Sequence, residues 1–167
     1  VDECPTLKRF GLKSIDVNQD DGTSNVFLTE CPHLEKIDLK FNPGLCFTID
    51  ESSLLNLTHL TMMTSHDQCE YMQVKPWEAF IHQSEDTQMK PWVAMLKECK
   101  QLEYLFIDGN LLPSTNEWLE AVLALKSLNT LILPYLKDGK DKVNEILHGL
   151  KNLQKFILKD CEIDPTL

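Results

Sequence analysis

The sequence predicts an α/β fold in which short parallel strands alternate with helices along one chain. A phrase of the form L-x-x-L-x-L, with other apolar residues at some leucine positions, occurs six times. Its apolar residues alternate with others, as in a strand that buries one face. Segments between the phrases place apolar residues at helical spacing behind capping residues. The phrases are Leu7/Phe10/Leu12, Leu34/Ile37/Leu39, Leu57/Leu60/Met62, Leu102/Leu105/Ile107, Leu128/Leu131/Leu133 and Leu153/Phe156/Leu158.

The spacing of the phrases indicates the repeat class. Their first residues are 27, 23, 45, 26 and 25 residues apart, and four of these intervals fall in or close to the range of leucine-rich repeats. Such repeats stack as a solenoid whose strands line the concave face and whose wider helices line the convex face. We therefore expect one domain over residues 1–167, an arc of about six repeats similar to ribonuclease inhibitor. Because the chain opens on what reads as the end of an earlier repeat, we expect it to belong to a longer protein.

Helices are expected between the strands. Capping residues stand at positions 23–24, 50–53, 114–117 and 141, each before a short apolar pattern. Each helix would turn its apolar face toward the strands. The expected inward residues are Val26, Phe27 and Leu28; Leu54 and Leu55; Leu119, Val122 and Leu123; and Val143, Ile146, Leu147 and Leu150.

The interval of 45 residues is the least regular part of the chain. Residues 63–98 contain a near-duplicate, Lys75-Pro76-Trp77 and Lys90-Pro91-Trp92. Both copies read as helix starts, because proline is favoured in the first helical turn, and we expect Phe80/Ile81 and Met95/Leu96 on the inner faces. One interpretation is an irregular, double-length repeat in which the tryptophans pack on their neighbours. The other is a protruding insertion that holds part of a partner site.

Composition narrows the functional classes. The net charge of −10 disfavours nucleic acid and anionic membranes as partners, since phosphate contacts require a basic surface. No apolar run approaches the roughly 18 residues that span a bilayer, and the first residues carry no apolar signal segment. Cys4, Cys31 and Cys99 each stand three residues before a first leucine, which favours reduced core thiols over disulfides. We therefore expect a cytoplasmic or nuclear protein.

Catalytic and metal-binding motifs are not recognisable in the sequence. The five histidines are scattered, and neither C-x-x-C nor H-E-x-x-H spacing occurs. His66 and Cys69 are near in sequence, but a nucleophile is activated by a base that is close in space. We therefore expect a binding protein rather than an enzyme, with no metal or cofactor.

The outward strand positions form the candidate site. Six of them are basic and two are acidic, so this face would carry about +4 and the rest of the chain about −14. A protein partner with an acidic or phosphorylated segment would be attracted here, although lysines on strands can also serve only to keep an open surface soluble. Apolar residues beside tyrosines would add a hot spot. The candidate residues are Arg9, Lys13, Lys36, Asp38, Lys40, His59, Tyr104, Phe106, Asp108, Ile132, Tyr135, Lys155, Ile157 and Lys159, and the remaining outward positions are Gly11, Thr61, Met63, Thr130 and Pro134.

Three segments resemble the cysteine-containing repeats of the F-box leucine-rich-repeat family, in which C-P-x-L-x-x-L-x-L recurs. They are residues 3–7 (Glu3-Cys4-Pro5-Thr6-Leu7), 30–39, which begin Glu30-Cys31-Pro32-His33-Leu34, and 98–102 (Glu98-Cys99-Lys100-Gln101-Leu102). The last two repeats depart from the pattern and lack the leading cysteine. The resemblance implies the substrate-recognition part of a cullin-type ubiquitin ligase receptor. An F-box, which docks onto the ligase adaptor, would then lie upstream of Val1.

Two other interpretations stay open. Residues 128–134, together with the irregular repeat lengths, are similar to the C-terminal repeats of NOD-like innate immune receptors. In that family the repeats sense ligands and autoinhibit a nucleotide-binding module. A stand-alone cytosolic repeat scaffold is the third interpretation. The three differ in what precedes Val1: an F-box, a P-loop module or a start codon.

Overall fold

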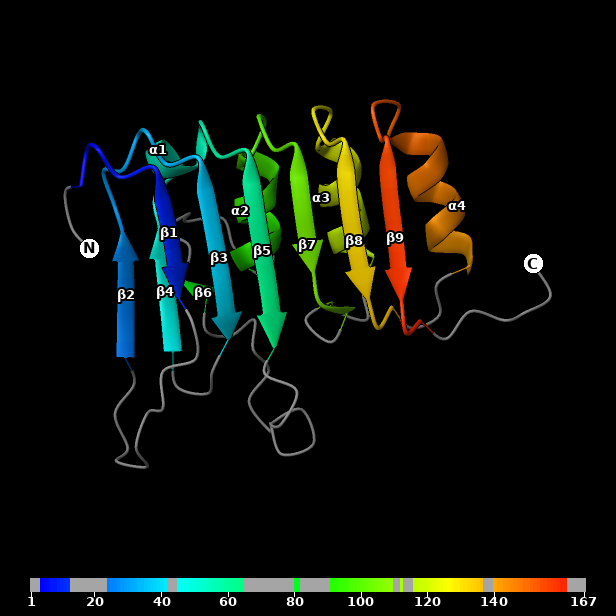
Figure 1. Cartoon of the computed structure of the whole chain (residues 1–167), viewed down its shortest axis with the longest axis horizontal. Coiled ribbons are helices and arrows are strands. Elements are labelled where there is room, and N and C mark those ends of the chain that lie inside the picture. Colours follow the sequence, from blue (N-terminus) through cyan, green and yellow to red (C-terminus); the bar gives the residue numbers. More distant parts are fainter. Residues whose placement is uncertain are drawn as a thin grey trace.

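The chain folds as an α/β protein built on a six-stranded parallel sheet (Figure 1). The computed structural model describes residues 4–12, 24–41, 45–64, 80–81, 91–109, 112, 116–136 and 140–161. The sheet has the order β1-β3-β5-β7-β8-β9, so each strand pairs with the previous and the next strand of this same sheet. The predicted class is confirmed. The strands are β1 (Arg9–Leu12), β3 (Lys36–Phe41), β5 (His59–Thr64), β7 (Tyr104–Ile107), β8 (Thr130–Pro134) and β9 (Lys155–Lys159).

The register aligns the central apolar residues of the six phrases. Ile37 is paired with Phe10 on one side and Leu60 on the other, and the row continues through Leu105 and Leu131 to Phe156. The inner members of this row are fully buried. Because side chains alternate between the two faces of a strand, this register sends the intervening residues to the opposite face. The predicted alternation is confirmed.

The same turn precedes each of the six strands. In each turn the N–H of the phrase's first leucine donates to the carbonyl three residues earlier, at 3.0 to 3.3 Å. The carbonyl of the residue after that leucine then accepts two N–H groups from the next turn, as Glu35 does from Thr58 and His59 at 2.9 and 3.0 Å. These bonds satisfy backbone groups that lie outside the strand pairing.

A polar side chain also joins three of the turns to the preceding one. Asn56 Nδ2 donates to the carbonyl of Pro32 at 2.7 Å, and Asn152 Nδ2 donates to that of Lys126 at 2.7 Å. Ser127 Oγ makes the corresponding bond to the carbonyl of Lys100 at 3.1 Å. All three side chains stand immediately before a first leucine. Successive turns are therefore tied directly to one another.

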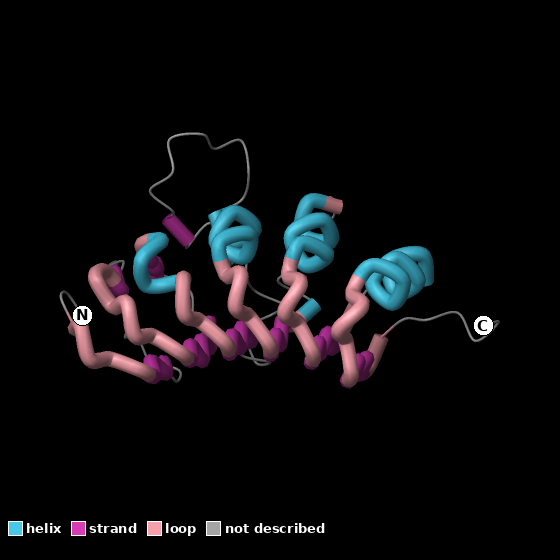
Figure 2. The backbone as a smooth tube through the Cα atoms, turned by 90° about the horizontal axis from the view of Figure 1, so that it is seen from above, coloured by secondary structure: helices cyan, strands magenta, loops and turns pink. Residues whose placement is uncertain are grey.

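Four helices in the described part of the chain lie on one side of this sheet (Figure 2). They are α1 (Glu51–Leu54), α2 (Pro91–Glu98), α3 (Glu117–Ala124) and α4 (Lys140–Gly149). The helix start at Pro91 is confirmed. Leu55 and Leu147 were expected to face inward, but they are 54% and 53% exposed. One turn of α4 presents only a narrow stripe to the core, and Ile146 and Leu150 occupy it.

A second, three-stranded parallel sheet replaces two of the expected helical segments. Its strands are β2 (Ser24–Leu28), β4 (Leu45–Ile49) and β6 (Phe80–Ile81), in the order β2-β4-β6. This sheet lies on the helix side of the larger sheet (Figure 2). The helix expected at 26–28 is therefore wrong, as is the helical position expected for Phe80 and Ile81. Both segments are too short to form a stable helix. Pairing with a parallel neighbouring strand satisfies their backbone N–H and C=O groups instead.

One apolar cluster fills the space between the large sheet and the helices. It contains the inward strand residues, Trp118 from α3, and the buried thiols of Cys31 and Cys99. The buried Cys31 and Cys99 occupy core positions, as predicted, and the partly buried Cys4 and Cys161 pack against the same cluster. Burial, with a smaller contribution from Glu98, raises the pKa of the Cys99 thiol to about 12, so this thiol is unreactive.

Candidate partner-binding face

The helix-free face is the side of the six-stranded sheet opposite the helices. The row of strands is gently bowed, and this face is the inside of the bow (Figure 2). Most predicted site residues lie on it with side chains exposed or partly exposed. Those residues are Arg9, Lys36, Asp38, Lys40, His59, Tyr104, Phe106, Ile132, Lys155, Ile157 and Lys159. Lys13 lies outside the described residues.

Two positions of the predicted face are not available to a partner. Asp108 is only 4% exposed, and Pro134 is also buried. Asp108 lies just beyond β7, where the next residue, Gly109, packs directly against the carbonyls of Pro134 and Tyr135. Strand alternation predicted an outward side chain at position 108, but β7 ends at Ile107, so the alternation does not extend to Asp108. Tyr135 follows β8, is partly exposed and has a left-handed φ of 59°.

The first outward position of each strand forms a row with basic ends and aromatic rings in the middle. The register places Arg9 and Lys36 at one end of the row and Lys155 at the other. Between them the rings of His59 and Tyr104 stack with their centroids 5.5 Å apart and an interplanar angle of 19°. Aromatic rings packed this way form a rigid surface with little side-chain entropy left to lose.

A hydrogen-bond chain orients the His59 ring. Thr58 Oγ1 donates to the carbonyl of Glu35 at 3.0 Å and lies 2.9 Å from His59 Nδ1. The Thr58 hydroxyl therefore links the His59 ring to the backbone of the preceding turn and limits its rotation.

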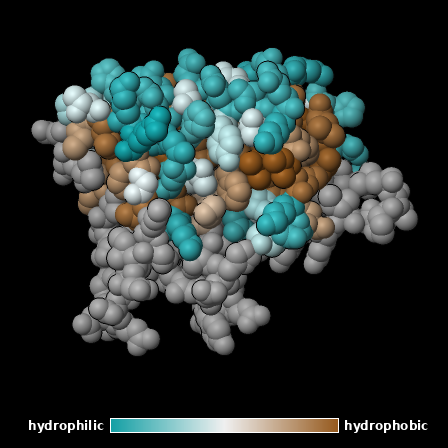
Figure 3. All heavy atoms as spheres, in the orientation of Figure 1, coloured by the Kyte–Doolittle hydropathy of each residue, from teal (hydrophilic) through white to brown (hydrophobic). Residues whose placement is uncertain are grey.

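The second outward position changes from polar to apolar along the sheet. Gly11, Asp38 and Thr61 occupy it on β1, β3 and β5, and Phe106, Ile132 and Ile157 occupy it on β7, β8 and β9. Figure 3 shows the resulting apolar surface over β8 and β9. The helix-free face is therefore divided into a polar half and an apolar half.

Positive charge predominates on the described part of this face. It carries five basic side chains and one acidic side chain, Asp38. Lys36 Nζ lies 3.2 Å from Asp38 Oδ2, and Lys159 Nζ lies 3.9 Å from Asp160 Oδ2 at the rim. These pairs are exposed and contribute little to stability. At the other rim, the hydrogen bond and charge of Lys8 lower the pKa of Glu35.

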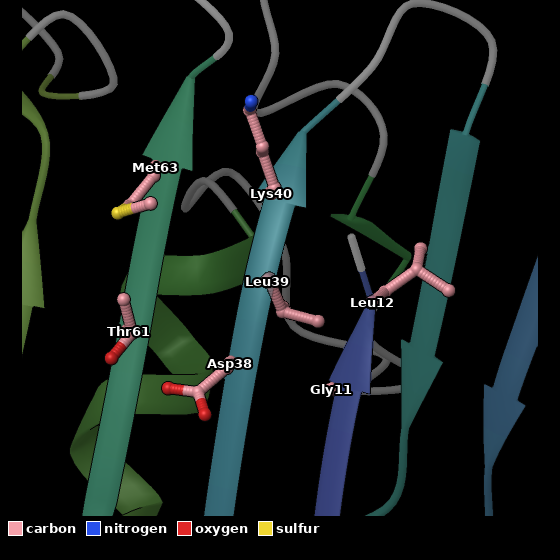
Figure 4. Close-up of a pocket in the computed structure, with 7 residues that line it drawn as sticks. All are labelled: Gly11, Leu12, Asp38, Leu39, Lys40, Thr61 and Met63. Atoms are coloured by element: carbon pink, nitrogen blue, oxygen red, sulfur yellow. The ribbon is translucent and has the colours of Figure 1, made fainter. Parts of the chain in front are cut away.

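A hollow of about 590 Å³ opens at the C-terminal ends of β1, β3 and β5. The Asp38 carboxylate points toward β5, which carries Thr61, and no labelled side chain covers Gly11 (Figure 4). Gly11 was not among the predicted partner-binding residues. A glycine at an outward strand position can nevertheless mark a place where a ligand or another backbone approaches closely. The described residues that line the hollow are Gly11, Leu12, Asp38, Leu39, Lys40, Thr61 and Met63.

Metal and membrane chemistry find no support in the described residues. No group of three or more histidine, cysteine, aspartate or glutamate side chains among them could hold a metal ion. None of the helices in the described ranges is long and apolar enough to cross a membrane. His66, Cys69 and Lys75-Pro76-Trp77 lie outside those ranges, so their predicted roles stay predictions.

No protein-family model matches this chain, and searches of curated proteins and solved structures found no match. What the chain does is therefore inferred from its own residues.

Proposed function

We propose that this chain is a leucine-rich-repeat module that binds a partner protein on its helix-free face. The uncovered sheet face carries the proposal. All-parallel sheets are usually covered on both faces, yet Phe106, Ile132 and Ile157 stand partly exposed on this one. Apolar and aromatic residues grouped among charges are the usual composition of a protein interface.

The repeat assignment is supported by recurrence at three levels. The L-x-x-L-x-L phrase, the turn that precedes each strand and the in-line register each occur along the whole sheet. Within the large sheet each described strand pairs only with its neighbours, which is the pairing expected of a stacked repeat.

The proposed role is the substrate-recognition part of a cullin-type ubiquitin ligase receptor. Its support is the C-x-x-L frame, in which Cys31 and Cys99 are buried and close the turns to Leu34 and Leu102 at 3.0 Å. The same frame carries the resemblance to the F-box leucine-rich-repeat family. In this role the face would hold the protein that is to be tagged.

Site-specific photo-crosslinking in cells tests both parts. A photoreactive amino acid replaces Phe106 on the helix-free face, and a matched variant carries it at Leu147, which is 53% exposed on α4. We expect position 106 to capture a protein that position 147 does not, and we expect this protein to accumulate when the proteasome is inhibited. Equal capture at both positions contradicts the proposed face. Capture at 106 of a protein whose level does not respond to the inhibitor contradicts the ligase role alone.

A further inference from the structure

Gly11 is the only glycine among the outward strand positions of the described residues. Inside a strand, glycine costs roughly 0.5–1 kcal/mol relative to alanine, unless the backbone or its packing requires it. The backbone of Gly11 is not in the left-handed region. A Cβ built on it would have Asp38 Cβ at 4.0 Å as its nearest neighbour, which is an ordinary contact. Neither conformation nor packing therefore requires glycine here.

The missing side chain leaves the hollow open. Lys36 holds the Asp38 carboxylate at 3.2 Å, and the carboxylate points toward β5, away from Gly11 (Figure 4). The exposed Met63 and the partly exposed Leu12 supply apolar surface, whereas the Leu39 side chain is buried in the core. The hollow extends from β1 to β5, two strand spacings or about 10 Å, which is wide enough for one branched side chain.

The charges around the hollow favour particular residues on either side of a partner side chain that enters it. Arg9, Lys36 and Lys40 lie on β1 and β3, whereas Asp38 is the acidic residue that lines the hollow among those described. Asp38 is already paired with Lys36. The surplus positive charge favours acidic neighbours on either side of an inserted apolar side chain.

We propose that the Gly11 hollow is a socket that receives one bulky aliphatic side chain from an acidic segment of the partner protein. This inference rests on the proposed function, and it adds the chemistry of the segment that is recognised.

Two variants change the volume of the socket without a clash. Gly11→Leu places a branched side chain in the hollow above position 11, and Gly11→Ala places only a methyl group there. The matched control is Thr130→Leu, which adds a similar bulk to an outward, partly exposed position on β8. All three variants should retain the wild-type melting temperature within a few degrees, since outward positions contribute little to the core.

The probes are capped pentapeptides observed by NMR. The first peptide has one leucine between two pairs of aspartates, the second has alanine in place of leucine, and the third has lysines in place of the aspartates. The signals followed are the Met63 methyl group and the Gly11 amide. We expect saturable shifts with the leucine peptide, about tenfold weaker binding of the alanine peptide and no binding of the lysine peptide.

The variants separate the socket from the face as a whole. Gly11→Leu should weaken binding of the leucine peptide about tenfold or more, Gly11→Ala should weaken it less, and Thr130→Leu should leave it unchanged. If Gly11→Leu binds as tightly as the wild type while shifts gather around Phe106 and Ile132, the socket is wrong and the proposed function stands. If no peptide shifts any signal of the helix-free face, both proposals are contradicted.

Discussion

Asp50 joins two segments of the chain through one carboxylate, which accepts three hydrogen bonds. It accepts the N–H of Ser53 at 2.9 Å, which begins α1, and the N–H of Glu30 at 2.8 Å. Ser52 Oγ donates to it at 3.1 Å. Glu30 has a left-handed φ of 54°, so this bond also supports a strained turn. Partial burial acts to raise the pKa of Asp50, but these hydrogen bonds outweigh burial and leave the pKa lowered.

Replacing Asp50 should destabilise the fold in a pH-dependent way. We expect Asp50→Ala to lower the free energy of unfolding by about 1 kcal/mol at pH 7, as for other N-cap losses. Because the folded pKa is lowered, the stabilising effect is present above the unfolded value of about 3.9 and is lost as pH falls through the lower folded value. Urea unfolding at pH 7 and pH 2 measures the difference. A gap between wild type and variant that is equal at the two pH values would contradict this role.

Gly109 has no room for a side chain, whereas Gly11 does. A Cβ on Gly109 would lie 2.6 Å from the carbonyl oxygen of Pro134 and closer still to that of Tyr135. These are backbone atoms and cannot rotate away. We expect Gly109→Ala to cost roughly 1–3 kcal/mol, as in other overpacked sites. Gly11→Ala is the control and should be neutral or slightly stabilising. Thermal unfolding of both variants measures the difference. Equal melting temperatures would contradict the close backbone approach at Gly109.

At the scale of the strand, adjacent residues of β7 lie on opposite faces of the sheet. Leu105 is fully buried, and Phe106 is partly exposed. We expect Leu105→Ala to cost roughly 2–5 kcal/mol, because it leaves a cavity in the core, and Phe106→Ala to cost about 1 kcal/mol or less. Chemical denaturation measures both. A cost below about 1 kcal/mol for Leu105→Ala would mean that the register is shifted by one residue.

The strands of the large sheet were predictable because each repeats one phrase with a period of two. The second sheet was not, since an apolar run as short as residues 24–28 fits a strand or a buried helical turn equally well. Only pairing with β4, which is distant in sequence, decides between them. The outward positions were predictable within the strands, and the prediction was wrong at Asp108, which follows the end of β7 and is buried.

The socket and the turn contacts lay beyond sequence reasoning for the same reason. Glycine at position 11 signals an exception, but the open space above it depends on the direction of the Asp38 side chain on the next strand. Likewise, the bonds of Asn56 and Asn152 to the preceding turn depend on the strand register, which brings the accepting carbonyls within reach.

For the molecule as a whole, partner binding should be separable from folding. We expect simultaneous replacement of Lys36, Lys40, Tyr104 and Phe106 by alanine to weaken binding of the crosslinked partner strongly while changing the melting temperature little, because all four lie outside the fully buried core. Binding should also weaken as salt concentration rises, since the face is positively charged. Calorimetry with the captured partner measures both effects. Unaltered affinity with an intact melting curve would remove the helix-free face as the binding site.

The neighbour-only contacts of the turns also set the order in which the protein opens. Phe156 and Leu158 on the terminal strand β9 are only partly buried, whereas Leu60 and Leu105 at the centre are fully buried. Detaching β9 breaks one interface, while exposing the amides of β5 requires neighbours on both sides to separate. The same holds for β1 at the other edge, where Phe10 and Leu12 are also partly buried. Amide hydrogens should therefore exchange with solvent fastest in β1 and β9 and slowest in β5 and β7. The stacked His59 and Tyr104 rings consequently occupy the part of the sheet that stays closed longest.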